Sequence, residues 1–215
     1  PAYELVAGAR RLRACRLAGV AEIPAMIREL TDDQAMEAAI IENLQREDVS
    51  VMEEAEGFRV LMERSAMTAK DVAGKIGKSV RHVYQRLQLL ELTHEAAEAL
   101  RTGTIDPSKA REISYIPDPK LQAKALTYAS EKDHKGDPSH STRDVAQWVR
   151  MNIMLRMDRA RFDTASATLC PAAGACSTCP KRTGSNPDLF ANSDGPDLCT
   201  DPACYHAKED AHDEA

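Results

Sequence analysis

The chain has 215 residues, enough for one large domain or roughly two to three small ones, and its composition leans helical, with only 4% aromatic residues. It contains no run of about eighteen apolar residues and no secretory leader, which excludes a membrane-spanning protein and predicts a soluble, cytoplasmic one. The net charge of −6 argues against a nucleic-acid partner, but from Thr183 onward eight acidic residues face Lys208 alone, so the residues before Thr183 sum to +1.

The N-terminal end is predicted to form a small α/β unit. Residues 3–6 read as a strand, 9–18 as a helix, and 23–28 as a second strand after a turn at Gly19. Because the sequence starts at Pro1 directly on the strand-like YELV segment, we expect a fragment that lacks an N-terminal part.

The middle of the chain is predicted to be a series of helices. Thr31 begins the first as its N-cap, and Gln34 completes a capping box. A second helix carries one apolar stripe from about Ser50 to Arg64. Glycines and prolines then separate shorter helices, expected near 69–76, 80–90, 94–101, 107–114, 118–131 and 142–157. Regular periodicity stops beyond Cys170.

Residues 68–90 are predicted to form a helix-turn-helix. Thr68 caps the first helix, Gly77 turns the chain and Ser79 caps the second helix. Five Lys or Arg residues face Asp71 alone here, a local surplus of +4 inside an acidic chain. The face of the second helix predicted to be buried consists of Val80, Val83, Tyr84, Leu87 and Leu90. The opposite, polar face consists of Arg81, His82, Gln85, Arg86 and Gln88.

This polar face suits the edges of bases in the DNA major groove. Arginine can grip guanine and glutamine adenine, with about 1–3 kcal/mol of discrimination for each good pair. The predicted base-reading residues are Ser79, Arg81, His82 and Gln85. The predicted phosphate contacts are Lys70, Lys78 and Arg86. The alternative is a helical hairpin with a solvated basic face.

Two charged motifs bracket the N-terminal unit, GARRLRA at 8–14 and ENLQRED at 42–48. Gly8 lets the backbone approach an anion, the following helix offers its N-terminal amides, and Arg10 and Arg11 add charged donors, which together suit a triphosphate. Glu42 and Asn43 carry the oxygen ligands that Mg²⁺ prefers. The same strings also fit ordinary solvated surface, so both interpretations stay open.

Three segments occur in a characteristic order: GARRLRACRLAG, then ENLQREDVSVMEEAEGFRVLM, then the helix-turn-helix ending RLQLLEL. In this order they resemble ParB-type chromosome and plasmid partition proteins, over residues 3–155. The resemblance implies a ParB/sulfiredoxin-like nucleotide unit that binds CTP, a domain that binds a centromere-like DNA site, a sliding dimeric clamp, and a partner ATPase of the ParA type. It also implies that phosphates contact Gly8, Arg10 and Arg11, and that Mg²⁺ is supported by Glu42 and Asn43.

The first motif departs from this family at Ala9. The family commonly has GERR, with a glutamate tied to hydrolysis, whereas a methyl group can neither orient water nor accept a proton. We therefore expect CTP binding to survive and hydrolysis to be slow or absent. The nucleotide-contacting segment that precedes the first strand in the family does not occur in this sequence, which bears on binding itself.

A further basic segment, IDPSKAREI at 105–113, lies where the family's DNA-binding domain makes additional backbone contacts. Lys109 and Arg111 are therefore candidates for phosphate contact. The alternative is that both are surface charges at the start of a helix.

The C-terminal part concentrates five of the six cysteines after residue 169. Tetrahedral zinc takes four thiolates, and two close pairs fit this need, so the predicted ligands are Cys176, Cys179, Cys199 and Cys204. Cys170 is then a spare thiol, and His206 is an alternative fourth ligand. The segment between the pairs is rich in turn formers and needs a staple to fold. Disulfides or free thiols are the alternative, although a cytoplasmic protein seldom keeps disulfides.

The expected fold class is α+β and mainly α, in three parts. These are a partial nucleotide-binding unit at 1–48, a helical DNA-binding domain at 49–160, and a zinc-stapled module with an acidic tail at 161–215. A homodimer is expected, because one helix-turn-helix buries little groove surface. The rival interpretations are a plasmid or phage transcriptional regulator on the same scaffold and a ParB-like nuclease, for which no dense Asp/Glu/His cluster is present.

Overall fold

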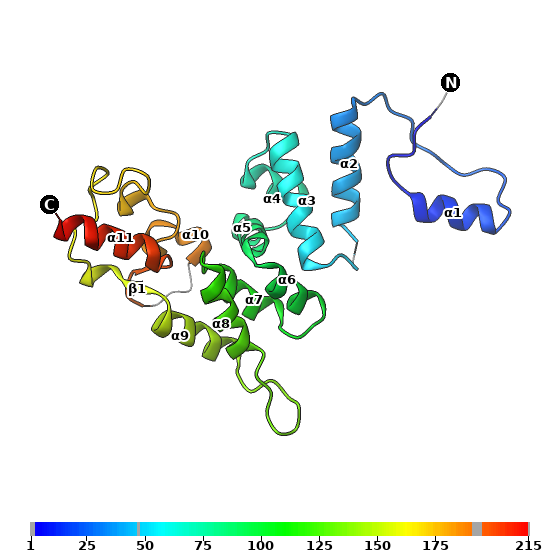
Figure 1. The fold of residues 1–215 in the computed structure, drawn as a ribbon. Coiled ribbons are helices and arrows are strands. Elements are labelled where there is room, and N and C mark those ends of the chain that lie inside the picture. Colours follow the sequence, from blue (N-terminus) through cyan, green and yellow to red (C-terminus); the bar gives the residue numbers. More distant parts are fainter. Residues whose placement is uncertain (1–2, 47, 191–194, 215) are drawn as a thin grey trace. The chain divides into compact units, whose positions relative to one another are not determined.

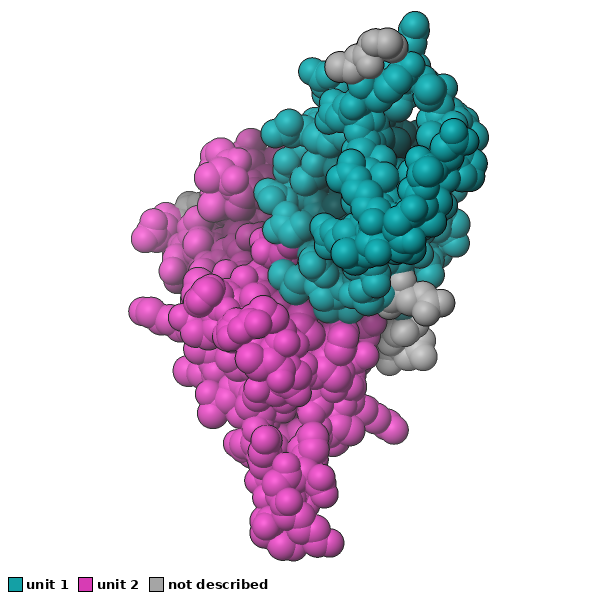
Figure 2. Space-filling model, turned by 90° about the vertical axis from the view of Figure 1, so that its right-hand side faces the viewer, with its two compact units in different colours: residues 1–83 teal, residues 84–215 magenta. Residues whose placement is uncertain are grey.

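The protein is mainly helical (Figure 1), and the computed structural model describes residues 3–46, 48–190 and 195–214. None of the helices in these ranges is long and apolar enough to cross a membrane. The chain divides by packing into two compact units, residues 1–83 and 84–215 (Figure 2). This boundary falls inside one helix of the predicted DNA-binding domain, between Val83 and Tyr84.

Three helices of the first unit begin with side chains that satisfy free backbone amides. The unit contains α1 (Ala9–Leu17), α2 (Asp32–Leu44), α3 (Val51–Arg64), α4 (Ala69–Ile76) and the start of α5 (Val80–Gln88). Capping boxes open three of them, formed by Thr31 with Gln34, Ser50 with Glu53, and Thr68 with Asp71. Each box satisfies two backbone donors within four residues, so the sequence alone fixes where the helix starts. The predicted box at Thr31 is thereby confirmed.

The two strands predicted for the first unit are not present. Residues 3–6 and 23–28 have no regular secondary structure, and most of their side chains are exposed, including Tyr3, Met26 and Ile27. A strand is stabilised by hydrogen bonds to a neighbouring strand, and none pairs with either segment within the described part of the unit. The two predicted strands were therefore wrong, and these segments are extended chain without regular pairing.

The core of the first unit lies between α3 and α4. The apolar side of α3 buries Ala55, Phe58 and Leu61, and α4 buries Val72 and Ala73. On its other side α3 packs against α2, where a Cβ added at Gly57 would lie 3.1 Å from the Leu44 side chain. The glycine in the middle of α3 is therefore explained by a close approach of two helices.

The second unit continues with short helices at the predicted positions. They are a 3-10 turn at Leu89–Glu91, α6 (His94–Arg101), α7 (Pro107–Ser114), α8 (Pro119–Ala129) and α9 (Thr142–Asn152). The last of them ends five residues before the predicted residue 157. Asp106 and Asp118 cap α7 and α8, and each is followed by a proline at the first helical position.

The cysteine-rich end forms a small folded module. A two-residue strand β1 (Leu155–Arg156) pairs antiparallel with β2 (Leu198–Cys199), and the polar C-terminal segment forms α11 (Pro202–Asp213). The short helix α10 (Pro187–Phe190) lies between β1 and β2 in the sequence. The acidic tail thus contains α11, a helix that its weak apolar periodicity did not indicate.

Asp197 holds the loop that precedes β2. Its carboxylate accepts hydrogen bonds from Arg182 Nε at 2.6 Å, Thr183 Oγ1 at 3.2 Å and the Gly184 amide at 2.8 Å. A Cβ at Gly184 would lie 2.7 Å from this carboxylate, which explains a glycine there. Hydrogen bonds to the Asp197 carboxylate therefore hold residues 182–184 next to the start of β2.

Candidate nucleic-acid, nucleotide and metal sites

The predicted helix-turn-helix is formed by α4 and α5. Gly77 ends α4 in the left-handed conformation, with φ of 70°, which turns the chain toward α5. Ser79 Oγ accepts a hydrogen bond from the His82 amide at 3.1 Å, as predicted for an N-cap. The turn geometry is thus specified by a glycine and a serine that lie two residues apart.

The outward side of α5 differs from the predicted one, first at Tyr84. Tyr84 was expected to be buried, but its side chain is exposed at 38%, whereas Val83 is fully buried. Arg81, Tyr84 and Gln85 are spaced three and four residues apart, so they share one side of the helix. This outer stripe, defined as Arg81, Tyr84 and Gln85, contains two predicted base readers and one aromatic residue that the sequence pattern missed.

His82, a predicted base reader, is used inside the protein. Its Nε2 lies 2.7 Å from Glu54 Oε1 on α3, and its ring meets the Phe58 ring edge-on with centroids 6.1 Å apart. The side chain is only 27% exposed. His82 therefore holds α5 against α3 rather than presenting a free ring to DNA. Helical spacing alone could not show this, because Glu54 and Phe58 are distant from His82 in the sequence.

The predicted phosphate contacts differ in accessibility. Lys70 and Lys78 are exposed on either side of Gly77. Arg86 is half-buried and is engaged in an interaction within the chain. Lys70 and Lys78 are therefore the two of these residues whose ammonium groups are open to a phosphate.

The basic segment in α7 is more enclosed than expected. Lys109 is 4% exposed, so the structure does not present it as a surface cation. Arg111 has a side chain that is 27% exposed and forms an ion pair with Glu112 at 3.2 Å. Residues 105–113 thus pack into the second unit, and direct phosphate contact by Lys109 would require its side chain to leave a buried position.

The two charged motifs of the first unit meet in the structure. Gly8, with φ of 90°, is the N-cap of α1, and the first turn of this helix has neither an acidic residue nor a side-chain cap. Arg10 Nη1 lies 3.5 Å from Asp48 Oδ2. Arg46 also binds Asp48, with Nη2–Oδ2 at 2.7 Å, and this hydrogen bond lowers the pKa of the Asp48 carboxyl. An anionic group from the second motif therefore already lies beside an arginine of the first.

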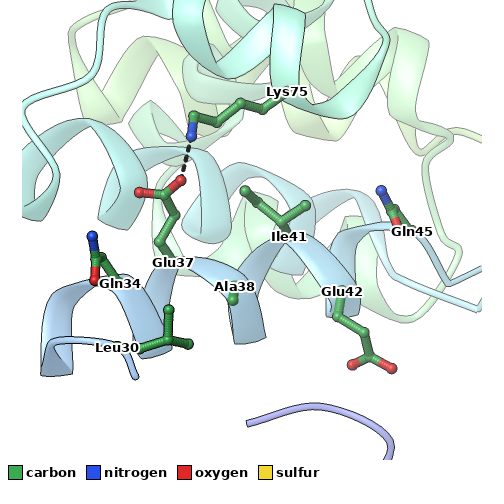
Figure 3. A pocket seen from close by; sticks show the side chains of 8 residues that line it. All are labelled: Leu30, Gln34, Glu37, Ala38, Ile41, Glu42, Gln45 and Lys75. Carbon is green, nitrogen blue, oxygen red and sulfur yellow. Dashed lines mark hydrogen bonds and ion pairs between the residues drawn. The ribbon is translucent and has the colours of Figure 1, made fainter. Parts of the chain in front are cut away.

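The predicted magnesium residues lie at the end of α2. Asn43 Oδ1 accepts a hydrogen bond from Arg46 Nη1 at 3.0 Å. Glu42 lines an open depression of about 570 Å³ on α2, where its carboxylate points away from Lys75, while Glu37 forms an ion pair with that lysine (Figure 3). The described residues contain no group of three or more His, Cys, Asp or Glu side chains placed to hold a metal ion.

The cysteines of the C-terminal module lie close together without forming such a group. All six cysteines of the chain are free thiols, and Cys176 and Cys199 are buried in one cluster with Met157, Phe162 and Tyr205. Burial raises the pKa of the Cys199 thiol to about 11. His206, the alternative ligand, is exposed and hydrogen-bonds Glu209 at 3.0 Å. The predicted zinc site is therefore not confirmed by the positions of these side chains.

Helices α4 and α5, with the exposed Lys70 and Lys78 beside their turn, thus form a helix-turn-helix. A family model described as the ParB HTH domain matches residues 47–136, and one described as the ParB N-terminal domain matches residues 1–44. The chain belongs to the ParB family of chromosome-partitioning proteins. The family resemblance of the three motifs is thereby confirmed.

Relatives from several bacteria share this part of the sequence. The chromosome-partitioning protein Spo0J of Thermus thermophilus is 47% identical over 120 residues, which are 55% of this chain and 44% of that protein. ParB of Caulobacter vibrioides is 43% identical over 124 residues, 58% of this chain and 41% of that protein. The chain thus spans less than half the length of these curated relatives.

A solved structure shares the fold. The C-terminally truncated ParB from Caulobacter crescentus, complexed to the centromeric parS site, matches with a TM-score of 0.59 and 36% identity. The match covers 68% of this chain and 74% of the other. The cysteine-rich module lies beyond the residues that either family model matches.

Proposed function

We propose that this chain is the DNA-binding part of a partition protein that recognises a centromere-like site and is regulated by CTP. The observation that carries the proposal is the likeness, at 36% identity, to a ParB bound to parS, together with the outer stripe on α5, in which Tyr84 is exposed and Arg81 and Gln85 are half-buried. The proposed partners are double-stranded DNA, a second copy of the chain and a partition ATPase of the ParA type.

Within the helix-turn-helix, the proposed base contacts are made from the outer stripe of α5. Arg81 offers a forked donor for guanine, Gln85 a donor and acceptor for adenine, and Tyr84 a phenol beside them. Ser79 remains a candidate, since its hydroxyl can donate while it caps the helix. Lys70 and Lys78 are proposed to bind phosphates on either side of the turn.

Substitutions should separate base reading from phosphate binding. Arg81→Ala and Gln85→Ala are each expected to lower the discrimination between specific and random duplexes by about 1–3 kcal/mol, because a base-edge contact is lost. Lys78→Ala should weaken binding to all duplexes and reduce the slope of log K against log salt by about 0.9. Fluorescence anisotropy titrations at several salt concentrations measure both quantities.

The matched control is Arg161→Ala, a basic residue outside both family-model matches, which should leave DNA binding unchanged. The DNA site itself is found by selecting bound sequences from random duplexes with and without CTP. Enrichment of no sequence in either arm, or an unchanged site preference in both α5 variants, contradicts the proposed recognition helix.

For CTP, the proposed phosphate ligands are the free amides after Gly8 and the side chains of Arg10 and Arg11. Nucleotide phosphates would then replace Asp48 as the partner of Arg10, which is an exposed and weak ion pair. Mg²⁺ would use Glu42 and Asn43, and Asn43 would give up its hydrogen bond from Arg46. The donor set therefore suits a magnesium triphosphate after local rearrangement.

Hydrolysis of CTP is expected to be slow or absent, since Ala9 supplies no base. Isothermal titration with CTP and Mg²⁺ should detect binding, while phosphate release stays near the rate without protein. Ala9→Glu, which introduces a carboxylate, is the matched variant and is expected to release phosphate faster. Rapid magnesium-dependent release by the unchanged protein would refute the assignment of Ala9.

For the C-terminal module, the proposed zinc ligands are Cys176, Cys179, Cys199 and Cys204. The support is their two-pair spacing, the shared buried cluster of Cys176 and Cys199, and the start of α11 at the second pair. The thiols must turn toward one point to bind the ion. Zinc would then join segments that are otherwise connected by few apolar contacts.

A further inference from the structure

Lys208 is a buried lysine in the cysteine-rich module. It is 2% exposed, although it lies on the polar helix α11. Its ammonium donates to the Gly174 carbonyl at 2.6 Å and to Cys176 Sγ at 3.1 Å, and it interacts electrostatically with Cys179 and Cys204. The ammonium group therefore contacts the thiol of Cys176, one of the four paired cysteines.

The surroundings of this ammonium do not balance its charge. A buried charge is stable only when it is paired and hydrogen-bonded. Within the described ranges no carboxylate lies within ion-pair distance of Lys208, and its other close neighbour is the Phe162 ring, 6.0 Å from Nζ. A carbonyl and a neutral thiol satisfy donors but carry no net charge. Among the described residues, the site thus has a positive charge without a partner anion.

The position of Lys208 on α11 explains why it faces the cysteines. Cys204 lies in the first turn of the helix and Lys208 follows it by four residues, so the two side chains share one side. Another side of the helix carries the exposed residues His206, Ala207 and Asp210. One side of the helix is therefore built for the cysteine cluster and the other for solvent.

We propose that Lys208 is the charge-balancing residue of a zinc–thiolate centre made by Cys176, Cys179, Cys199 and Cys204. This inference rests on the proposed zinc site. Zn²⁺ with four thiolates carries a net charge of about −2, and this anion is the partner that the buried ammonium lacks. Lys208 donates N–H···S to the Cys176 ligand, which orients that sulfur and offsets part of the charge. It acts through the ligand and does not bind the metal itself.

This role differs from that of a merely structural lysine. A structural Lys208 would hold the Gly174 loop through a hydrogen bond alone, and its loss would lower thermal stability without altering the metal. A charge-balancing Lys208 changes the affinity for zinc and the electronic environment of the Cys176 sulfur. The two roles therefore differ in metal affinity and in the spectrum of the metal centre.

The experiment uses the full chain purified under reducing conditions. Metal analysis should first find about one equivalent of zinc in the unchanged protein. Competition with a chromophoric chelator should then show that Lys208→Met weakens zinc binding by about 10–100-fold, the effect typical of residues that support metal ligands. Lys208→Arg keeps the charge and should recover most of the affinity. In the cobalt-substituted protein, Lys208→Met should shift the thiolate-to-metal absorption band.

Two controls keep the outcomes distinct. Arg161→Met removes the same charge from a side chain that is 63% exposed and pairs with Glu209. The zinc affinity of this variant should therefore equal that of the unchanged protein. Lys208→Gln keeps donors for Gly174 and Cys176 but lacks the charge, and it replaces Lys208→Met if that variant does not fold. Gln should show the same loss of affinity, because the charge is absent.

The results separate failure of the site from failure of the lysine. Less than half an equivalent of zinc in the unchanged protein overturns both the zinc site and the role of Lys208. A full equivalent with unchanged affinity and cobalt spectrum in the Lys208→Met or Lys208→Gln variant overturns only the lysine. A tenfold or larger loss that Arg161→Met does not share supports it.

Discussion

Replacing Phe58 with alanine is expected to destabilise the first unit by about 3–5 kcal/mol, the range found when a buried phenylalanine leaves a cavity. Phe58 is fully buried on α3, and its ring meets the edge of His82 on α5. Removing the ring therefore empties the core beneath the helix-turn-helix and frees one side of His82. Affinity for specific DNA should fall with stability, because α5 loses a contact that positions it.

Urea denaturation followed by circular dichroism measures this change. Arg59→Ala is the matched control, since the neighbouring Arg59 forms only exposed pairs with Glu56 and Glu63 and should alter stability by about 0.5 kcal/mol or less. A loss below about 1 kcal/mol for Phe58→Ala would mean that the α3–α4 core does not determine the stability of this unit.

Replacing Gln122 with methionine should destabilise the second unit by about 1–3 kcal/mol, the cost of leaving the buried Ile116 carbonyl unpaired, and by more if the two part-buried bonds to Thr93 and Glu91 also contribute. Gln122 Oε1 accepts from the Thr93 amide at 2.9 Å, and its Nε2 donates to the carbonyls of Glu91 and Ile116, both at 2.8 Å. One side chain on α8 thus forms hydrogen bonds with backbone groups of the segment before α6 and of the segment after α7. Methionine keeps the volume and removes every hydrogen bond.

Thermal denaturation compares this variant with Gln147→Met, the same substitution at an exposed position of α9. The control should change the free energy of unfolding by about 0.5 kcal/mol or less. Hydrogen exchange adds a local readout, because the Thr93 amide should lose protection in Gln122→Met. Equal stability of the two variants would show that this network is replaceable by apolar packing.

Much of the helical order was predictable because its signals are local. A capping residue, its partner three positions later and an apolar stripe all lie within one or two helical turns. Thr31, Ser50 and Thr68 therefore mark the starts of their helices in the sequence. The same holds for Gly77 between α4 and α5. These signals do not depend on any other part of the fold.

The candidate sites were predictable as motifs but less so residue by residue. Arg81 and Gln85 are placed on an outer face by helical spacing, whereas His82 is drawn inward by Glu54 from a helix 28 residues earlier. Lys109 was a candidate surface cation and is buried by its neighbours in the second unit. The strands expected at 3–6 and 23–28 failed for the same reason, since a strand needs a partner from elsewhere.

The sequence by itself therefore determined the helix boundaries, the helix-turn-helix and the family, because hydrogen bonds and spacing within a few residues specify them. Only the tertiary structure decided that Tyr84 is exposed, that His82 pairs with Glu54, that Gln122 ties three backbone groups, and that Lys208 contacts Cys176. Each of these features depends on which side chain from a distant segment packs beside the residue. The packing of separate segments decides this, and short-range sequence patterns do not encode it.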